Sequence, residues 1–334
     1  ITATSVTNLT GTASAMATLM GQEGDSGNKV NLDGDFTATV DSGSVAAADL
    51  TTISAKTTGN ITATGVTALT GTAAAINTLV GDESDSSDGV NLDTDYTATI
   101  TDTDVAASVL NTLNTNVPGL ITATSVTNLT GTAADMATLM GNEGDSGNKV
   151  NLDGDFTATV DAGTVAAADL NTISAKTSGT ITATGATTIT GTASAVAAMV
   201  GDSEISVAAN YAVTIASGSA AAGDLNTINT DTAGLVTATS VTTITGTASV
   251  IATLMGNEGD SGNKVNLDGD FTVTVSAGSV AAGDLNTINS KTSGLITATS
   301  VTNLTGTASA MATLMGQEGD SGNKVNLDGD FTAT

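Results

Sequence analysis

Apolar and threonine residues alternate in short segments that recur along the chain. Residues 1–4 read Ile-Thr-Ala-Thr, and residues 36–39 read Phe-Thr-Ala-Thr. Alternation with a period of two is typical of a β-strand that has one buried and one solvated face. We therefore predict a strand at each segment, with its threonines on the outer face. Small interior residues such as Ala3 and Ala38 would let two layers approach closely.

A helical spacing follows each predicted strand. Within residues 11–20 the apolar side chains recur three and four positions apart, as on one face of a short helix, at Ala13, Met16, Leu19 and Met20. Thr12 stands just before them, where a hydroxyl can cap a helix N-terminus. The second half of the pattern has the same order, with Ser44 as the predicted cap and a buried face of Val45, Leu50 and Ile53.

These patterns form tandem repeats. The first motif begins at residues 1, 61, 121, 181, 236 and 296, and the second at 36, 96, 156, 211, 271 and 331. We predict repeats at 1–60, 61–120, 121–180, 181–235 (shortened), 236–295 and 296–334 (partial). Residues 1–39 and 296–334 are identical, so we expect the chain to begin and end within a longer array.

The repeats predict a solenoid. We expect a parallel β-sheet with one strand per coil of 25 or 35 residues, and short helices or helical turns on the opposite side. One coil alone could not fold, because each borrows hydrogen bonds and buried surface from its neighbours. An all-β solenoid remains the alternative, because the helical segments are short and their threonine-rich flanks weaken helix propensity.

A polar insert at residues 24–35 distinguishes the longer coil from the shorter one. It returns at 144–155, 259–270 and 319–330. The second repeat changes the loop to Asn91-Leu92-Asp93-Thr94-Asp95, which keeps the oxygens and loses the glycine, and the fourth repeat lacks the insert. Each copy carries three oxygen-bearing side chains at alternate positions, the ligand type that calcium prefers. The candidate metal ligands are Asn31, Asp33, Asp35, Asn91, Asp93, Asp95, Asn151, Asp153, Asp155, Asn266, Asp268, Asp270, Asn326, Asp328 and Asp330. A turn at Asp-Gly without a bound ion is the alternative.

Composition excludes several kinds of chemistry. The 334 residues include 7 basic side chains, all lysines, 34 acidic ones, and no His, Cys or Trp. The formal net charge of -27 and the absence of a basic patch argue against a nucleic-acid partner. The acids recur in every insert instead of meeting once in a pocket, so we expect neither an enzyme nor a small-molecule substrate. Calcium is the one cofactor that the composition allows us to expect.

Stacked coils would align the Thr-x-Thr pairs, such as Thr2 with Thr4 and Thr37 with Thr39, into rows on a flat face. Such arrays resemble those of solenoidal ice-binding proteins. Ice binding is therefore the alternative function. Ordinary β-propensity explains threonine on a solvated sheet face equally well.

The two halves of the repeat resemble, over essentially the whole chain, the tandem repeats of giant extracellular surface proteins of bacteria, including cyanobacterial proteins grouped with calcium-binding adhesins. The halves read G-x-I-T-A-T-S-V-T-x-L-T-G-T-A and A-A-A-D-L-N-T-I-x-x-K-T-S-G. The G-G-x-G-x-D signature of calcium-binding nonapeptide repeats is absent. The resemblance implies a structural or adhesive role outside the cell, as part of a fibre, stalk or matrix.

Two further expectations concern partners. Exposed strand edges or lateral threonine faces would let copies of the chain associate into a filament or bundle. No run of about 18 apolar residues exists, so we expect no membrane span.

Overall fold

The computed structural model describes residues 1–334 except 25, 28, 82 and 84–88. It contains two compact units. Unit 1 comprises Ile1–Thr159 and Lys176–Thr180, and unit 2 comprises Val160–Ala175 and Ile181–Thr334. Each unit is a parallel β-solenoid that carries short helices on the side opposite its strands. The predicted fold class is therefore confirmed.

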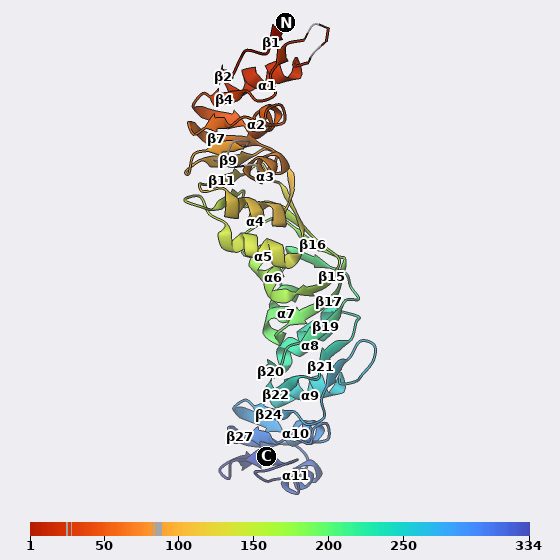
Figure 1. Ribbon diagram of the computed structural model, residues 1–334. Coiled ribbons are helices and arrows are strands. Elements are labelled where there is room, and N and C mark those ends of the chain that lie inside the picture. Colours follow the sequence, from red (N-terminus) through yellow and green to blue (C-terminus); the bar gives the residue numbers. More distant parts are fainter. Residues whose placement is uncertain (25, 28, 82, 84–88) are drawn as a thin grey trace. The chain divides into compact units, whose positions relative to one another are not determined.

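Short helices follow the strands at regular intervals. In unit 1 they are α1 (Ala13–Gly21), α2 (Ala47–Ser54), α3 (Ala73–Gly81), α4 (Ala107–Asn116) and α5 (Ala133–Asn142). In unit 2 they are α6 (Ala167–Ser174), α7 (Ala193–Val200), α8 (Ala222–Asp231), α9 (Ala248–Gly256), α10 (Ala282–Asn289) and α11 (Ala308–Met315). Within unit 1, α1 to α4 succeed one another along one side of the strands (Figure 1).

The strands are two to six residues long. Those of unit 1 are β1 (Thr2–Ala3), β2 (Asn8–Gly11), β3 (Asn31–Leu32), β4 (Thr37–Val40), β5 (Gly43–Ala46), β6 (Ile61–Ala63), β7 (Val66–Gly71), β8 (Val90–Leu92), β9 (Thr97–Ile100), β10 (Asp104–Ala106), β11 (Ile121–Ala123), β12 (Asn128–Gly131), β13 (Val150–Leu152) and β14 (Thr157–Val160, whose last residue belongs to unit 2). Those of unit 2 are β15 (Gly163–Ala166), β16 (Ile181–Ala183), β17 (Ala186–Gly191), β18 (Ile205–Val207), β19 (Ala212–Ile215), β20 (Gly218–Ala221), β21 (Val236–Ala238), β22 (Val241–Gly246), β23 (Val265–Leu267), β24 (Thr272–Val275), β25 (Gly278–Ala281), β26 (Ile296–Ala298), β27 (Val301–Thr305), β28 (Val325–Leu327) and β29 (Thr332–Ala333).

Strands from successive coils pair in parallel and form rows. In unit 1 the order β5-β7-β9-β11-β13 makes one row, and β2-β4-β6-β8 makes another. In unit 2 the rows β15-β17-β19-β21-β23 and β20-β22-β24-β26-β28 contain the same five types of strand as the row from β5 to β13. A full row begins at a Gly-Ser-Val-Ala type strand and ends at a Val-Asn-Leu strand contributed by the insert. One coil contributes strands to two rows, so the rows overlap along each unit.

The pairing register explains why each row has a limited length. In unit 1 Thr70 lies opposite Thr99, Thr99 opposite Thr122, and Thr122 opposite Asn151. The first two steps are 29 and 23 residues and together cover 52 residues, eight fewer than the 60-residue repeat. The first strand that a repeat adds to the row therefore shifts: the second repeat joins through its second strand, β7, and the third repeat through its first strand, β11. A row consequently ends after five strands and a new row continues beside it.

A continuous buried column lies under the five-strand row of unit 1. In the row from β5 to β13 the inward residues are Val45, Leu69, Ala98, Ile121 and Val150, each no more than 9% exposed. The helices close the core from the other side, with residues such as Leu50 and Ile76 fully buried. The interior position of Ala38, which is 1% exposed, is as predicted.

Two details of the sequence prediction need correction. Each coil contributes two or three strands instead of one. In the shorter coil residues 41–42 separate β4 from β5, and in the longer coil a turn at residues 64–65 separates β6 from β7 while the insert supplies the third strand, β8. Ser44 is also not a helix cap, since it lies within β5 and α2 begins after Ala46 without a side-chain cap. The cap at Thr12 is confirmed, because its Oγ1 accepts a hydrogen bond from the Ala15 amide at 3.2 Å.

Candidate functional site

The predicted calcium ligands divide between a strand and the turn that follows it. Each asparagine stands on the last strand of a row, with its side chain partly exposed on the outer face. The pairs across the row are Asn31 with Thr2, Asn91 with Thr62, Asn151 with Thr122, Asn266 with Thr237, and Asn326 with Thr297. The asparagines therefore continue the threonine columns of these rows.

The aspartates occupy a tight turn between this strand and the next. Asp33 and Asp35 are exposed, as are their counterparts in the other inserts except Asp93, which is partly buried. In the first insert the carbonyl of Gly34 accepts a hydrogen bond at 2.9 Å from the amide of Thr58 in the next coil. The predicted turn is thus confirmed, while calcium binding at its carboxylates stays a prediction.

The turn carboxylates that the structure describes do not gather into a metal site. Within the described part of the chain, no group of three or more aspartate or glutamate side chains is arranged to hold a metal ion. Some turn carboxylates bond locally instead. Asp93 Oδ1 accepts from the Thr94 amide at 2.7 Å, and Asp268 Oδ1 accepts from the Gly269 amide at 2.8 Å. Asp25 and Asn28 of the first insert lie outside the described residues.

Aligned hydroxyls form columns on the outer face of each row. One column in unit 1 reads Ala46, Thr70, Thr99, Thr122 and Asn151. All five are partly buried. The column thus contains three consecutive threonines, and the asparagine of the insert strand is its last residue. In the first motif, by contrast, the second threonine of each Thr-x-Thr pair lies beyond the strand, as Thr64 does.

A second outer column is cross-linked by its own side chains. In unit 1 Asn128 Nδ2 donates to Asp104 Oδ1 at 3.0 Å, and Thr157 Oγ1 donates to Asn128 Oδ1 at 3.1 Å. In unit 2 Asn303 Nδ2 contacts Ser279 Oγ at 3.1 Å, and Thr332 Oγ1 donates to Asn303 Oδ1 at 2.9 Å. These side chains hold neighbouring coils in register.

Ion pairs connect the start of an insert to the following coil. Lys56 Nζ lies 3.4 Å from Glu23 Oε2, Lys176 Nζ lies 3.1 Å from Glu143 Oε2, and Lys291 Nζ lies 3.3 Å from Glu258 Oε2. The lysine side chains are about two-fifths exposed, so each pair adds at most about 1 kcal/mol to stability. Their contribution is chiefly to position the insert against the coil.

Two repeats lack this lysine and carry a tyrosine in place of the phenylalanine at the Phe36 position. In the second repeat Tyr96 stands where the first has Phe36, and its Oη donates to Glu83 Oε2 at 3.2 Å. Burial, and then the charge and hydrogen bond of Glu83, raise the pKa of Tyr96 well above its ordinary value, so the phenol stays a donor. Sequence reasoning missed this contact, although tyrosine appears only in repeats where the lysine position holds Asn116 or Asp231.

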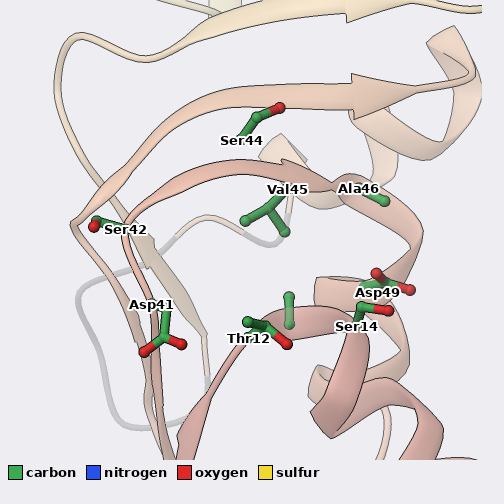
Figure 2. A pocket seen from close by; sticks show the side chains of 9 residues that line it. Thr12, Ser14, Asp41, Ser42, Ser44, Val45, Ala46 and Asp49 are labelled. Carbon is green, nitrogen blue, oxygen red and sulfur yellow. The ribbon is translucent and has the colours of Figure 1, made fainter.

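Oxygen-bearing side chains also surround a recess of about 130 Å³ at the helix starts of the first repeat. Figure 2 shows Ser14 of α1 beside Asp49 of α2, with Asp41 on another side of the recess. The related region of the second repeat indicates a role for such oxygens, because Asp102 Oδ2 accepts from the Ala73 amide at the start of α3 at 2.6 Å. The oxygens near helix starts therefore include caps for backbone amides.

The comparisons with known proteins give no relative from which a role could be transferred. No family model, no curated protein and no solved structure matches the chain. Among the residues that the structure describes, no helix has the length and apolar character needed to cross a membrane.

Proposed function

We propose that the chain is a structural repeat segment of a large extracellular fibre, stalk, matrix or adhesin protein. The main support is the repeated register, in which strands pair with the preceding and following coils at steps of 29 and 23 or 24 residues in both units. Such an arrangement lets length grow by adding coils without changing the packing of each coil. The columns of side-chain hydrogen bonds support the same role, because they tie coil to coil on the outer surface.

Electron microscopy of chains with three, five and ten repeats would test the structural role. We expect elongated particles whose length grows by a constant amount for each added repeat. Immunogold labelling of the producing cells with an antibody against the repeat should mark the cell surface or the surrounding matrix. Compact particles of irregular size, or labelling confined to the cell interior, would contradict the proposal.

Calcium uptake at the insert turns is part of this proposal. The support is chemical, since Asn151, Asp153 and Asp155 provide oxygen atoms at alternate positions and the chain carries a charge of -27. We expect calcium to raise the melting temperature, and a chelator at constant ionic strength to reverse the change. Asn substitution of Asp153 and Asp155 together should reduce the shift, whereas Asp161→Asn, an exposed control, should leave it unchanged. Equal shifts in all three proteins would indicate general charge screening.

Self-association into a filament or bundle is the proposed mode of partnership. Ile1 is 85% exposed and Met315 is 42% exposed, so coil faces of both units present apolar side chains. Either a further coil or another copy would bury these side chains. Sedimentation should show mass increasing with concentration, and Met315→Lys should reduce association more than the exposed control Thr313→Lys. A monomer at all concentrations would refute association by this 334-residue chain.

The hydroxyl columns support a second candidate function, ice binding. Each complete column aligns three threonines, for example Thr190, Thr214 and Thr237 in unit 2. Purified protein should then produce thermal hysteresis, and Thr214→Val combined with the corresponding changes in other rows should reduce it. Absence of hysteresis at high protein concentration would remove this candidate and leave the structural role.

A further inference from the structure

The shortened repeat of unit 2 departs from the others at one place. Its helix α7 ends at Val200, and β18 begins at Ile205 without the longer polar insert. The position occupied by Lys56 in the first repeat holds Asp231, and that of Phe36 holds Tyr211. The positive charge that meets a glutamate in three other repeats is therefore replaced by a negative one.

Two surface recesses meet at Asp231. The larger has a volume of about 470 Å³ and is lined by Val200, Asn226, Thr227, Thr230 and Asp231. The other, of about 360 Å³, lies along residues 203–209 and is also lined by Asp231. Asp231 thus lines both recesses, and Val200 at the end of α7 lines the larger one with it.

The two threonine hydroxyls of the larger recess have their hydrogens engaged elsewhere. Thr227 Oγ1 donates to the Gly223 carbonyl at 3.0 Å, and Thr230 Oγ1 donates to the Asn226 carbonyl at 2.8 Å. Both hydroxyls can therefore only accept a further hydrogen bond. Asn226 Nδ2 donates to the Val250 carbonyl at 3.0 Å, while its Oδ1 is buried without a hydrogen-bond partner.

Tyr211 fixes the carboxylate that gives the recess its charge. Its Oη donates to Asp231 Oδ2 at 2.6 Å, which leaves Oδ1 for a ligand. Burial, followed by the hydrogen bond and charge of Asp231, raises the pKa of Tyr211 well above its ordinary value. The phenol consequently remains protonated, and the carboxylate is held in one orientation at neutral pH.

We propose that the larger recess binds a primary ammonium group carried on an aliphatic stem. The ammonium would donate its three hydrogens to Asp231 Oδ1 and to neighbouring acceptors such as Thr230 Oγ1, with the stem against Val200. This contact would reproduce the lysine–carboxylate pairing of the other repeats with the two charges exchanged. A calcium ion fits less well, because one carboxylate cannot supply most of its six to eight oxygen ligands.

The 334-residue chain can be titrated with two probes and followed by NMR of its backbone amides. Nα-acetyl-lysine N-methylamide represents a lysine of another polypeptide, and cadaverine represents a free diamine. We expect saturable shifts at Val200, Thr227 and Thr230 with at least one of them. Tighter binding of the first assigns the ligand to a polypeptide, and tighter binding of the second assigns it to a free amine. The norleucine analogue, which has the same stem without the ammonium, should cause no saturable shift.

Variants locate the site. Asp231→Asn should weaken binding about tenfold, because a charged hydrogen bond is lost. Asp224→Asn removes the same charge from the first turn of the same helix and should leave the affinity unchanged. Thr230→Val, at an exposed position, tests an acceptor without disturbing Asp231 and should weaken binding about threefold. Equal affinity in all variants, saturable binding of the norleucine analogue, or displacement of the probes by equimolar calcium would overturn the proposal.

Discussion

The first and last 39 residues of the chain have the same sequence but different surroundings. Ile1 is 85% exposed, whereas its counterpart Ile296 is fully buried. The difference is reversed on the helices, where Met20 is 1% exposed and its counterpart Met315 is 42% exposed. One sequence therefore has two opposite patterns of burial within the same molecule.

The neighbouring coil explains the difference. Residues 1–39 have a following coil, whose helix α2 packs on α1, while residues 296–334 have a preceding coil, whose helix α10 packs on α11. Ile296 pairs with Val273 of the preceding coil, and the chain provides no such strand for Ile1. Each coil therefore has two apolar faces, one toward the preceding coil and one toward the following coil. A face is buried only where the adjacent coil is present.

The largest expected effect comes from the buried isoleucine. Ile296→Ala should reduce the free energy of unfolding of its coil by about 4 kcal/mol, because it removes buried methyl groups and leaves a cavity. Ile1→Ala should change it by less than about 0.5 kcal/mol, as expected at an exposed site. Hydrogen exchange of amides in β26 and β27, compared with β1 and β2, measures both. Similar effects of the two substitutions would contradict the coil-face explanation.

Gly294→Ala tests the attachment of the last coil to its predecessor. A Cβ at this position would lie 2.2 Å from the Phe271 carbonyl oxygen, so the backbone must move. The Gly294 amide also donates to Thr292 Oγ1 at 3.0 Å, and that hydroxyl bonds to Phe271. We expect a loss of about 3 kcal/mol.

Hydrogen exchange again provides the measurement for Gly294→Ala. It should become faster in residues 296–315 and remain unchanged in residues 1–20. Gly283→Ala, at an open helical site on α10, is the matched control and should not destabilise the coil. Unchanged exchange at Gly294→Ala would show that this close approach is not needed.

The methionines provide the converse experiment. Met20→Ala should cost about 2 kcal/mol, since its side chain is buried beside the following coil. Met315→Ala should cost less than half as much, because its side chain is already exposed. Appending residues 40–60 after Thr334 should bury Met315 and make the two costs equal. Unequal costs in the extended protein would mean that burial is not set by the adjacent coil.

The smallest expected effect concerns the ion pair. Glu23 meets Lys56 of the following coil, whereas Glu318, its counterpart, precedes no such lysine in this chain. Glu23→Gln should therefore cost about 0.5 kcal/mol at low salt and nothing measurable at 1 M salt. Glu318→Gln should have no effect under either condition. A loss at Glu23 that persists in high salt would point to packing instead of charge.

The repeated motifs were sufficient to predict the solenoid and the helices opposite its strands. Period-two and helical spacings identified Ala38, Leu50 and Met16 as core residues, and all three are buried. The number of strands per coil could not be obtained in this way. The turn interpretation of the insert did place a short strand at Val30-Asn31-Leu32, but the sequence does not show its partner, which is Thr2-Ala3 of β1.

The candidate sites were predictable to a smaller extent. The positions of Asn31 and Asp33 next to a turn followed from the sequence, but the direction of their side chains depends on the row that the strand joins. The contact of Tyr211 with Asp231 joins residues 20 positions apart, and only the winding of the coil brings them together. Comparing repeats position by position would have revealed the paired exchange of both residues.

The eight-residue offset between repeats has a mechanical consequence. In each unit one row of strands ends where the adjoining row is still continuous, so the ends of the rows are staggered along the solenoid. Separation of two coils at the end of one row would therefore also require breaking strand pairs within the adjoining row. Toughness against peeling would then come from the stagger of many weak joints, with no covalent cross-link required.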